Sequence, residues 1–554
     1  MTSNRAGHGS SSLVLHKQEF QTHVERRAPK VRVGGVYREN SRSSQRARPH
    51  FLSRNAPLFS LSYRRISRGI VLMPLAVMAE ILKPELCIIG AGALGIDLAV
   101  KARQRGLGVV LIERPTDESG DDAQAPLLRA AFVASAARAQ MLRTAGALGL
   151  EKAEPKPNFR TIAEHAAAVA ASAAPRDSVE RLTALGVTVL AGQAAFTDRQ
   201  TLKLGDNSIK ARQFVLATGA GPVEPALPGL DQVPYFTPDS ILANIRKLSH
   251  LVVIGGDAVA LELAQAYRRL GSDVTLVPQG ALLAGYDPET AAILLRALRE
   301  EGVNILHGAE VTAIVPRSQG TGIAIRRADG EDDALDVSHI LVAMGRVPDL
   351  DPTLLEKAKL KRDHKRADHL LVGPNGQTSN GRIAAIGGAA GEHRLHRAMR
   401  QGEIVLERLA GNASARIDPL RVPLVVATGP ALAQVGLTEA AGTPLRAGQL
   451  VLRAGFAEND AARAAGTASG SAKLVVGKNG AILGISVVGE GAGDVVAMLA
   501  MAMERGLTAG DLSALLLPQS SLASILIALG RQHQTQHKPT GWATRRAALR
   551  RLLP

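Results

Sequence analysis

A glycine-rich segment, G-A-G-A-L-G at residues 90–95, carries the clearest chemical signal in the chain. It follows the apolar run at 86–89 and opens an amphipathic stretch, and the next apolar run ends in an acid. In such a pattern the glycines allow a tight turn, a close approach of backbone to a pyrophosphate, and close packing of helix on strand. Free N–H groups and the helix dipole hold the anion, and the acid accepts hydrogen bonds from a ribose. The segment predicts dinucleotide binding, with a purely structural glycine turn as the alternative. The predicted contacts are those of Gly90, Gly92, Gly95 and Glu113.

A second segment, I-G-G-D-A-V-A-L-E at residues 254–262, has the same layout but different chemistry. Gly255 holds the first glycine position, but Asp257 stands at the second and Ala260 at the third. Alanine is tolerated at the third position. Asp257 adds a side chain where backbone should approach the ligand, and a negative charge beside two more. Each like-charge pair at roughly 4 Å costs about 1 kcal/mol when hydrated and about 4 kcal/mol at an effective dielectric near 20.

The strand after this second turn also lacks a ribose-binding group. It ends in V-P-Q at 277–279, with neither the acid that NAD requires nor an arginine for NADP. We therefore expect this unit to keep its fold while its ligand is lost. The alternative is a pyrophosphate displaced from the usual path, with Asp257 turned outward.

The elements that must position these turns alternate short apolar runs with longer amphipathic stretches, which is typical of parallel βαβ units. After Pro419 the pattern changes to alternating strands with interleaved helices, which predicts a separate α+β domain. The fold class is therefore α/β, with two Rossmann-like domains followed by an α+β domain. Strands are expected over 86–89, 109–112, 187–190, 214–216, 251–254, 274–277, 340–343, 383–386, 424–427, 473–476 and 482–488, and helices over 95–105, 130–148, 258–270, 290–301, 392–409, 494–506 and 522–529.

The net charge of +16 is concentrated in the two tails. Residues 1–77 hold 12 Arg and 2 Lys against 3 Glu, and residues 531–554 hold 5 Arg and 1 Lys with no acid, so the part between them is nearly neutral. We expect no nucleic-acid binding by the core, and solvated tails; contact of a tail with an anionic surface is the alternative. No apolar run is long enough to span a bilayer. A signal or transit peptide before residue 78 is weighed against translation from Met73 or Met78, and a cytoplasmic location is expected.

One cysteine, Cys87, lies inside an apolar run. A single thiol cannot form a disulfide, a dithiol centre or a cysteine metal cluster within one chain. We expect it to be a buried small hydrophobe.

Several ordered motifs resemble those of the pyridine nucleotide–disulfide oxidoreductases, the family of dihydrolipoamide dehydrogenase and mercuric reductase. The resemblance covers about residues 80–530. Besides the two turns, it rests on A-T-G-A at 217–220, P-G-L at 228–230, A-M-G-R-V-P at 343–348, T-S at 378–379, A-I-G-G-A-A-G at 385–391 and Q-V-G-L-T-E at 434–439.

The resemblance implies FAD on the first turn, NAD(P)H on the second and a homodimer formed by the last domain. It implies an FAD-binding domain in two parts over 80–230 and 346–418, an NAD(P)-binding-like domain over 231–345 and a dimerisation domain over 419–531. The charge distribution predicts a disordered basic extension over 1–79 and a basic tail over 532–554. Beyond the first turn, the implied cofactor-binding residues are Ala194, Thr218, Gly219 and Gly388 in the FAD domain, and Gly255, Glu262 and Gly345 in the second unit.

The redox dithiol that the resemblance implies is missing. The segment 118–129 contains no cysteine and carries an acidic pair at 121–122. The lysine expected to pair with Glu262 is Leu128 or, with a one-residue shift, Arg129. An Arg129–Glu262 ion pair and a solvated arginine are both open at this point.

Two further positions depart from the family pattern. The family's H-P-x-x-x-E appears as Q-S-S-L-A-S at 519–524, and glutamine has no group that shuttles a proton near neutral pH. Gly388 replaces the aspartate that hydrogen-bonds the FAD ribityl chain, and losing one charge-assisted bond costs about 1.5–3 kcal/mol.

These departures exclude disulfide reduction and favour an FAD-binding flavoprotein that is poorly or non-catalytic, a pseudoenzyme with no assigned catalytic residue or metal. NAD(P)H binding is doubtful. The alternative is an active oxidoreductase that passes electrons from NAD(P)H through FAD directly to a small acceptor, which the sequence does not identify.

Overall fold

The computed structural model describes residues 81–114, 125–439, 446–536 and 549. The N-terminal extension, the acidic pair at 121–122 and the basic segment 545–551, apart from Leu549, lie outside these residues.

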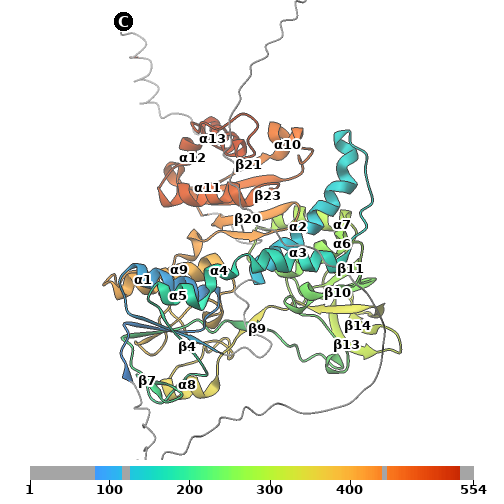
Figure 1. The fold of residues 1–554 in the computed structure, drawn as a ribbon. Helices are drawn as coiled ribbons and strands as arrows, with labels where there is room; N and C mark the ends of the chain where they lie inside the picture. The colour runs from blue at the N-terminus through green and yellow to red at the C-terminus, as the bar shows by residue number, and fades with distance from the viewer. Residues whose placement is uncertain (1–80, 115–124, 440–445, 537–548, 550–554) are drawn as a thin grey trace, which may run out of the picture. The chain divides into compact units, whose positions relative to one another are not determined.

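The first unit is built on a five-stranded parallel sheet in the order β18-β8-β2-β3-β4. Residues 383–385, which are far from β8 in the sequence, therefore lie beside β8 in the sheet. Helices α1 and α9 pack together on one face of the sheet, where Leu86, Ile88 and Val215 join their apolar side chains (Figure 1). The elements of this unit are β2 (Leu86–Ile89), α1 (Ala93–Gln104), β3 (Val109–Glu113), α4 (Ala174–Asp177), α5 (Val179–Ala184), β4 (Thr188–Ala191), β8 (Gln213–Leu216), β9 (Ala220–Pro222), β17 (Arg346–Pro348), α8 (Pro352–Ala358), β18 (Ile383–Ala385) and α9 (Leu395–Leu409). A small sheet is formed by β1 (Ile81–Leu82), β5 (Ala195–Phe196), β6 (Leu202–Leu204) and β7 (Asn207–Ile209).

The second unit repeats this plan with a four-stranded parallel sheet in the order β12-β11-β10-β16. Its strands are nearly continuous apolar runs, as expected of a sheet covered on both faces. The elements are β10 (His250–Ile254), α6 (Ala258–Arg269), β11 (Asp273–Val277), α7 (Pro288–Glu300), β12 (Val303–Ile305), β16 (His339–Val342), and an antiparallel sheet of β13 (Glu310–Pro316), β14 (Thr321–Arg326) and β15 (Asp332–Val337).

Helices α2 (Ala125–Thr144) and α3 (Phe159–Ala171) pack against each other, and α2 also packs on α6 (Figure 1). Phe132 of α2, Phe159 of α3 and Tyr267 of α6 form an aromatic contact, with ring centroids 5.3 Å apart for Phe132–Tyr267 and 6.0 Å for Phe159–Tyr267. Helix α2 was predicted at 130–148 and lies five residues earlier at its start, whereas α3 was not predicted.

The C-terminal unit is a five-stranded antiparallel sheet in the order β19-β20-β23-β22-β21, covered by helices. Helix α13 extends to Gln536, so the predicted tail begins inside a helix. The elements are β19 (Leu424–Val426), β20 (Ala431–Gly436), β21 (Leu450–Gly455), α10 (Asp460–Ala464), β22 (Ser471–Val476), β23 (Ile482–Gly489), α11 (Ala492–Glu504), α12 (Ala509–Leu512) and α13 (Ser524–Gln536).

A buried ion cluster joins the second unit to the C-terminal sheet. Lys473 of β22 is 4% exposed, and its Nζ lies 3.0 Å from carboxylate oxygens of Asp287, Glu289 and Glu439. Arg453 of β21 pairs with Glu289 at 2.9 Å. Burial opposes the charge on Lys473, but hydrogen bonds to Glu289, Asp287 and Glu439 prevail and raise its pKa. Both units therefore contribute charges to one network, whose centre at Lys473 and Asp287 is buried.

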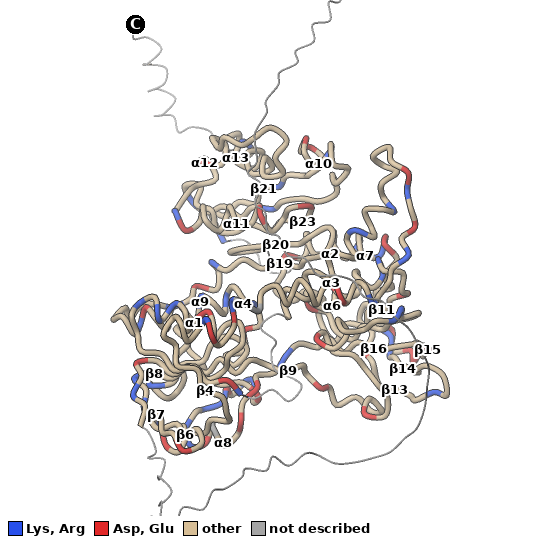
Figure 2. Tube along the Cα trace, in the orientation of Figure 1, with Lys and Arg blue, Asp and Glu red and all other residues tan. Residues whose placement is uncertain are grey.

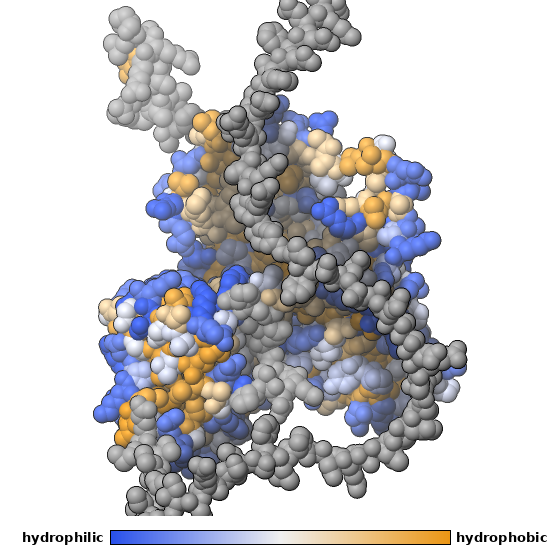
Figure 3. Space-filling model, in the orientation of Figure 1, coloured by the Kyte–Doolittle hydropathy of each residue, from blue (hydrophilic) through white to orange (hydrophobic). Residues whose placement is uncertain are grey.

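Charges of both signs are interspersed along the described chain (Figure 2). On the face shown in Figure 3, hydrophobic patches are interrupted by hydrophilic residues. Among the described helices, none has the length and hydropathy that crossing a bilayer requires.

Candidate functional site

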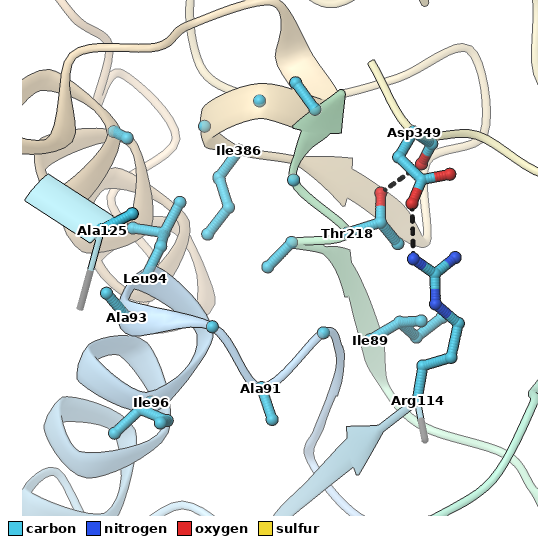
Figure 4. A pocket seen from close by; sticks show the side chains of 18 of the residues that line it. Ile89, Ala91, Ala93, Leu94, Ile96, Arg114, Ala125, Thr218, Asp349 and Ile386 are labelled. Atoms are coloured by element: carbon cyan, nitrogen blue, oxygen red, sulfur yellow. Dashed lines mark hydrogen bonds and ion pairs between the residues drawn. The ribbon is translucent and has the colours of Figure 1, made fainter. Parts of the chain in front are cut away.

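A cavity of about 630 Å³ opens at the carboxyl ends of the strands of the first sheet. Its walls include the ends of β2 and β3, the segment after β8 and the segment after β18 (Figure 4). In open parallel sheets, ligands bind at this edge.

The first glycine turn forms one wall of the cavity. Gly90 has φ 116°, and a Cβ on it would lie 2.2 Å from the carbonyl oxygen of Ala217. A Cβ on Gly95 would lie 1.9 Å from the carbonyl oxygen of Gly90. Gly90 and Gly92 line the cavity, while Gly95 allows helix α1 to pack on the turn. Gly90 and Gly95 therefore require glycine, because a Cβ at either position would collide with backbone.

The N-terminus of α1 is free of any side-chain cap. Gly92 is its N-cap residue, no side chain bonds to the first turn, and no acidic residue lies in that turn. Backbone N–H groups at a helix N-terminus without such a partner are donors for an anion.

The other residues predicted in the first unit also line the cavity: they are Glu113, Ala194, Thr218, Gly219 and Gly388.

The Thr218 hydroxyl is held in place by a short polar chain. It donates to the carbonyl oxygen of Asp349 at 2.7 Å, and the Asp349 carboxylate pairs with Arg114 at 2.6 Å (Figure 4). Arg114 and Asp349 both line the cavity, and the sequence analysis missed them. They directly follow the acid at 113 and the motif 343–348, so adjacency to recognised motifs was the signal that could have found them.

The sequence analysis also missed a charged group that lies just before helix α9. Glu392 and His393 line the cavity. Burial opposes ionisation of Glu392, but Arg394 at 2.6 Å and Arg397 at 3.0 Å outweigh it and hold its pKa below the usual range. Burial, followed by the nearby charge of Arg346, lowers the pKa of His393. This end of the cavity thus combines a carboxylate paired with two arginines and an imidazole whose charged form is disfavoured.

Gly388 lies in close backbone contact rather than beside open space. A Cβ on it would lie 2.5 Å from the carbonyl carbon of Gly219 and 2.8 Å from the nitrogen of Ala220. The chain has therefore closed the space that a side chain at this position would need.

The second turn has the backbone of the first but a different cap. Gly255 has φ 148°, and a Cβ on it would lie 1.9 Å from the carbonyl oxygen of Ala343. Asp257 is the N-cap of α6, and its carboxylate accepts a hydrogen bond from the N–H of Ala260 at 2.9 Å. The side chain therefore folds back onto the helix N-terminus, while the residue remains exposed to solvent.

Glu262 and Arg129 form the ion pair that the sequence left open. Arg129 Nε lies 3.5 Å from one Glu262 oxygen, and the other accepts from the N–H of Ala427 at 2.9 Å. Burial raises the pKa of Glu262, and Arg129 counteracts this. Arg129 lines the cavity, whereas Glu262 and Gly255 do not.

Gly345 also lies outside the cavity lining. It follows β16 with φ 96°, and a Cβ on it would meet no atom within 4 Å. Its positive φ is the reason for glycine at this position.

The thiol and the C-terminal motif offer no catalytic groups. Cys87 is fully buried in β2, and burial raises the pKa of its thiol. Gln519 is exposed in the loop before α13, and Ser524 accepts from the Asn459 amide at 2.9 Å.

Comparison with known proteins places this geometry in a family. Residues 84–402 match the family described as "Pyridine nucleotide-disulphide oxidoreductase", and residues 422–526 match its dimerisation domain. The chain belongs to the pyridine nucleotide-disulphide oxidoreductases. It is similar to a dihydrolipoyl dehydrogenase from Thermus scotoductus, with 31% identity over 467 residues that cover 80% of this chain and 96% of the relative. It is also similar to a mercuric reductase from Staphylococcus aureus, with 30% identity over 451 residues that cover 79% and 80%.

Solved structures share the fold. LpdA from Mycobacterium tuberculosis has a TM-score of 0.72 at 23% identity, covering 82% of this chain and 100% of its own. The flavoprotein disulfide reductase RclA from Escherichia coli has a TM-score of 0.69 at 23% identity, covering 81% and 99%.

FAD is a cofactor of the pyridine nucleotide-disulphide oxidoreductases. The cavity of this member fits it, because the glycine turn lines the cavity without a side chain at Gly90 or Gly92 and no side chain caps the N-terminus of α1.

Proposed function

We propose that this chain is an FAD-binding flavoprotein that lacks disulfide-reductase activity and is reduced poorly, or not at all, by NAD(P)H near neutral pH. The observation that carries the proposal is the difference between two helix N-termini. Helix α1 has no side-chain cap, whereas helix α6 is capped by the Asp257 carboxylate.

In the first unit, the residues present suit FAD. Gly90, Gly92 and the N-terminus of α1 would hold the pyrophosphate, Glu113 would accept hydrogen bonds from a ribose, and Ala194 would lie near the adenine. Thr218 and Gly219 would line the path of the cofactor. FAD, when bound, supplies the capacity to take up and release electrons.

In the second unit, the pyrophosphate would have to displace Asp257 from the N–H of Ala260 and lie beside its charge. Asp257 itself is exposed, so water screens the repulsion and the lower cost of about 1 kcal/mol per charge pair applies. Two such pairs weaken binding by about thirtyfold.

Disulfide reduction requires a thiolate that attacks and a second thiol that resolves. Cys87 is the single cysteine of the chain and is fully buried, so the chain cannot provide this pair.

The remaining parts of the proposal concern assembly and location. The match to the dimerisation domain supports a homodimer through residues 419–531. A cytoplasmic location is also proposed, since no described helix could span a bilayer. The electron acceptor, if there is one, is not assigned.

Visible absorption of the purified protein tests the first half of the proposal. We expect the native protein to show a flavin spectrum and to release FAD when it is denatured. A colourless protein that cannot be reconstituted with FAD would contradict this half of the proposal.

Anaerobic addition of NADH or NADPH at neutral pH tests the second half of the proposal, which concerns reduction of the flavin. Slow or no bleaching is expected, with full bleaching by dithionite as the control that the flavin is reducible.

The variant Asp257→Gly tests whether Asp257 is the cause of slow flavin reduction by NAD(P)H. Bleaching should become faster by an order of magnitude or more, because the variant removes both the charge and the competing cap. Asp273→Asn is the matched control, since it removes one carboxylate from the exposed opposite end of the same sheet. Rapid bleaching of the unmodified protein would overturn the proposal.

A further inference from the structure

The Arg114–Asp349 ion pair stands at the rim of the cavity in the first unit. Both residues line the cavity, yet their side chains are 54% and 40% exposed, so the pair lies where the cavity meets solvent (Figure 4). Arg114 Nη2 lies 2.6 Å from one carboxylate oxygen of Asp349. Arg114 also directly follows Glu113, the acid that would contact a ribose. The pair therefore lies close to the adenosine half of the proposed cofactor path.

The sheet topology places the two partners on opposite sides of the first glycine turn. Strand β2 lies between β3 and β8, and Ile89 at its end pairs with Ile112 of β3 and with Leu216 of β8. Arg114 comes two residues after Ile112, whereas Asp349 is bound to the segment that follows Leu216. Neighbouring strands lie about 4.8 Å apart, so the ends of β3 and β8 are separated by roughly 10 Å. A long side chain such as arginine is needed to cross this distance.

Asp349 is fixed to the β8 side through its backbone. Its N–H donates to the carbonyl oxygen of Gly219 at 3.2 Å, and its carbonyl oxygen accepts from the Thr218 hydroxyl at 2.7 Å. The antiparallel pairing of β9 with β17 holds the residues beside it. Rotation of the Arg114 side chain is therefore enough to open the ion pair, and no helix or strand has to move.

The next acid along the chain has a different role. Asp351 also lines the cavity, but it is the N-cap of α8. Its carboxylate accepts from the N–H of Thr353 at 2.8 Å and from the hydroxyl of the same residue at 2.7 Å. The contact that joins the two sides of the turn is thus made by the carboxylate of Asp349.

We propose that the Arg114–Asp349 pair is a clasp at the rim of the FAD cavity, which joins the two sides of the glycine turn and must open whenever the cofactor is exchanged. The inference rests on the proposed function, in which the first unit binds FAD. It adds two residues that control the rates of cofactor exchange through their contact with each other.

A contact between two residues of the chain has a different signature from a contact with the cofactor. The clasp closes to the same extent whether or not FAD lies in the cavity, so it cancels from the Kd and acts on both rates. An exposed ion pair is weak, and its closed form outnumbers the open form only a few-fold. Loss of either partner should therefore speed uptake and release by the same factor, about two- to fivefold, and leave the Kd unchanged.

FAD release from the loaded protein, followed by flavin fluorescence after dilution, tests the clasp together with the Kd from equilibrium dialysis. The ratio of the release rate to the Kd gives the uptake rate. Arg114→Met, Asp349→Asn and the double variant should all release FAD faster by the same factor, because each breaks the same contact. Arg114→Lys keeps the charge and should release FAD more slowly than Arg114→Met.

A matched control and a change of salt separate the clasp from a general effect of charge. Arg327 of the second unit pairs with Asp333 and has a side chain 57% exposed, so Arg327→Met removes a similar surface pair and should leave both rates unchanged. In about 1 M salt the Debye length falls to about 3 Å, and the unmodified protein should then release FAD as fast as Arg114→Met does.

Each outcome decides one statement. If Arg114→Met raises the Kd while Asp349→Asn lowers it or leaves it unchanged, Arg114 binds FAD directly and the clasp is wrong. If the effects of the two substitutions add in the double variant, or if all variants release FAD at the rate of the unmodified protein, the clasp is overturned and the proposed function stands. Faster release from Arg327→Met also overturns the clasp. If the unmodified protein binds no FAD, the proposed function fails and the clasp fails with it.

Discussion

Cys87 shows how burial decides the chemistry of a single residue. Its thiol has no solvent exposure, and burial raises its pKa, so the reactive thiolate is not formed. We predict that the folded protein reacts with no measurable thiol when treated with a disulfide reagent at neutral pH, and that one thiol per chain appears after addition of denaturant. Rapid reaction of the folded protein would contradict this and would reopen thiol chemistry.

At the residue scale, the sequence predicted that Asp257 places a negative charge at the second turn, but it did not predict where the side chain points. The acid is visible in the sequence, yet whether it points to a ligand, to solvent or to the helix depends on φ and ψ at the N-cap, which only the structure supplies. The Arg129–Glu262 pair was similarly undecidable, because a one-residue shift in α2 determines which side chain faces α6. Arg114 and Asp349 were missed because they lie far apart in sequence and meet only in the fold.

At the scale of elements, the close approach of Gly388 to Gly219 has a testable consequence. The family pattern suggests that aspartate at 388 would restore an anchor for FAD, but a Cβ there would lie 2.5 Å from the backbone of Gly219. We predict that Gly388→Asp lowers both FAD retention and thermal stability, and that Gly388→Ala does the same. Flavin release and the unfolding temperature measure these effects.

Gly345→Ala provides a contrast, since its Cβ would meet no atom and only its positive φ resists substitution. Its cost should be smaller, about 1 kcal/mol. Tighter FAD binding in Gly388→Asp would show that the backbone at 219–220 can move aside.

The prediction of helices and strands from the sequence succeeded where a single hydrophobic pattern marked the element. The buried strands β2, β10 and β11 are short apolar runs bounded by turn residues, and they were predicted within a residue of their bounds. Helix α3 was missed although its residues favour a helix and the Asn158 side chain caps its N-terminus, so the signal was present in the sequence. The short strands β5 and β9 carry no periodic signal, because two or three residues are too few to show one.

At the scale of the whole described molecule, the cluster around Lys473 connects two units through charge. Lys473 and Asp287 are almost completely buried, so removing one partner leaves an uncompensated buried charge. We predict that Lys473→Met lowers the free energy of unfolding by about 3–5 kcal/mol in urea denaturation. Lys478→Met, in an exposed position just after the same strand, is the control and should change it by no more than about 0.5 kcal/mol. Equal effects of the two substitutions would show that the cluster does not stabilise the fold.

The two ends of helix α6 make different contacts. Its first turn carries Asp257, while Gln265 and Arg269 further along both donate to the carbonyl oxygen of Gly429, at 2.7 Å and 2.8 Å. We therefore expect the far end of the helix to tolerate substitution less well than its first turn, because loss of Gln265 or Arg269 removes a donor from the Gly429 carbonyl across the contact with the C-terminal unit.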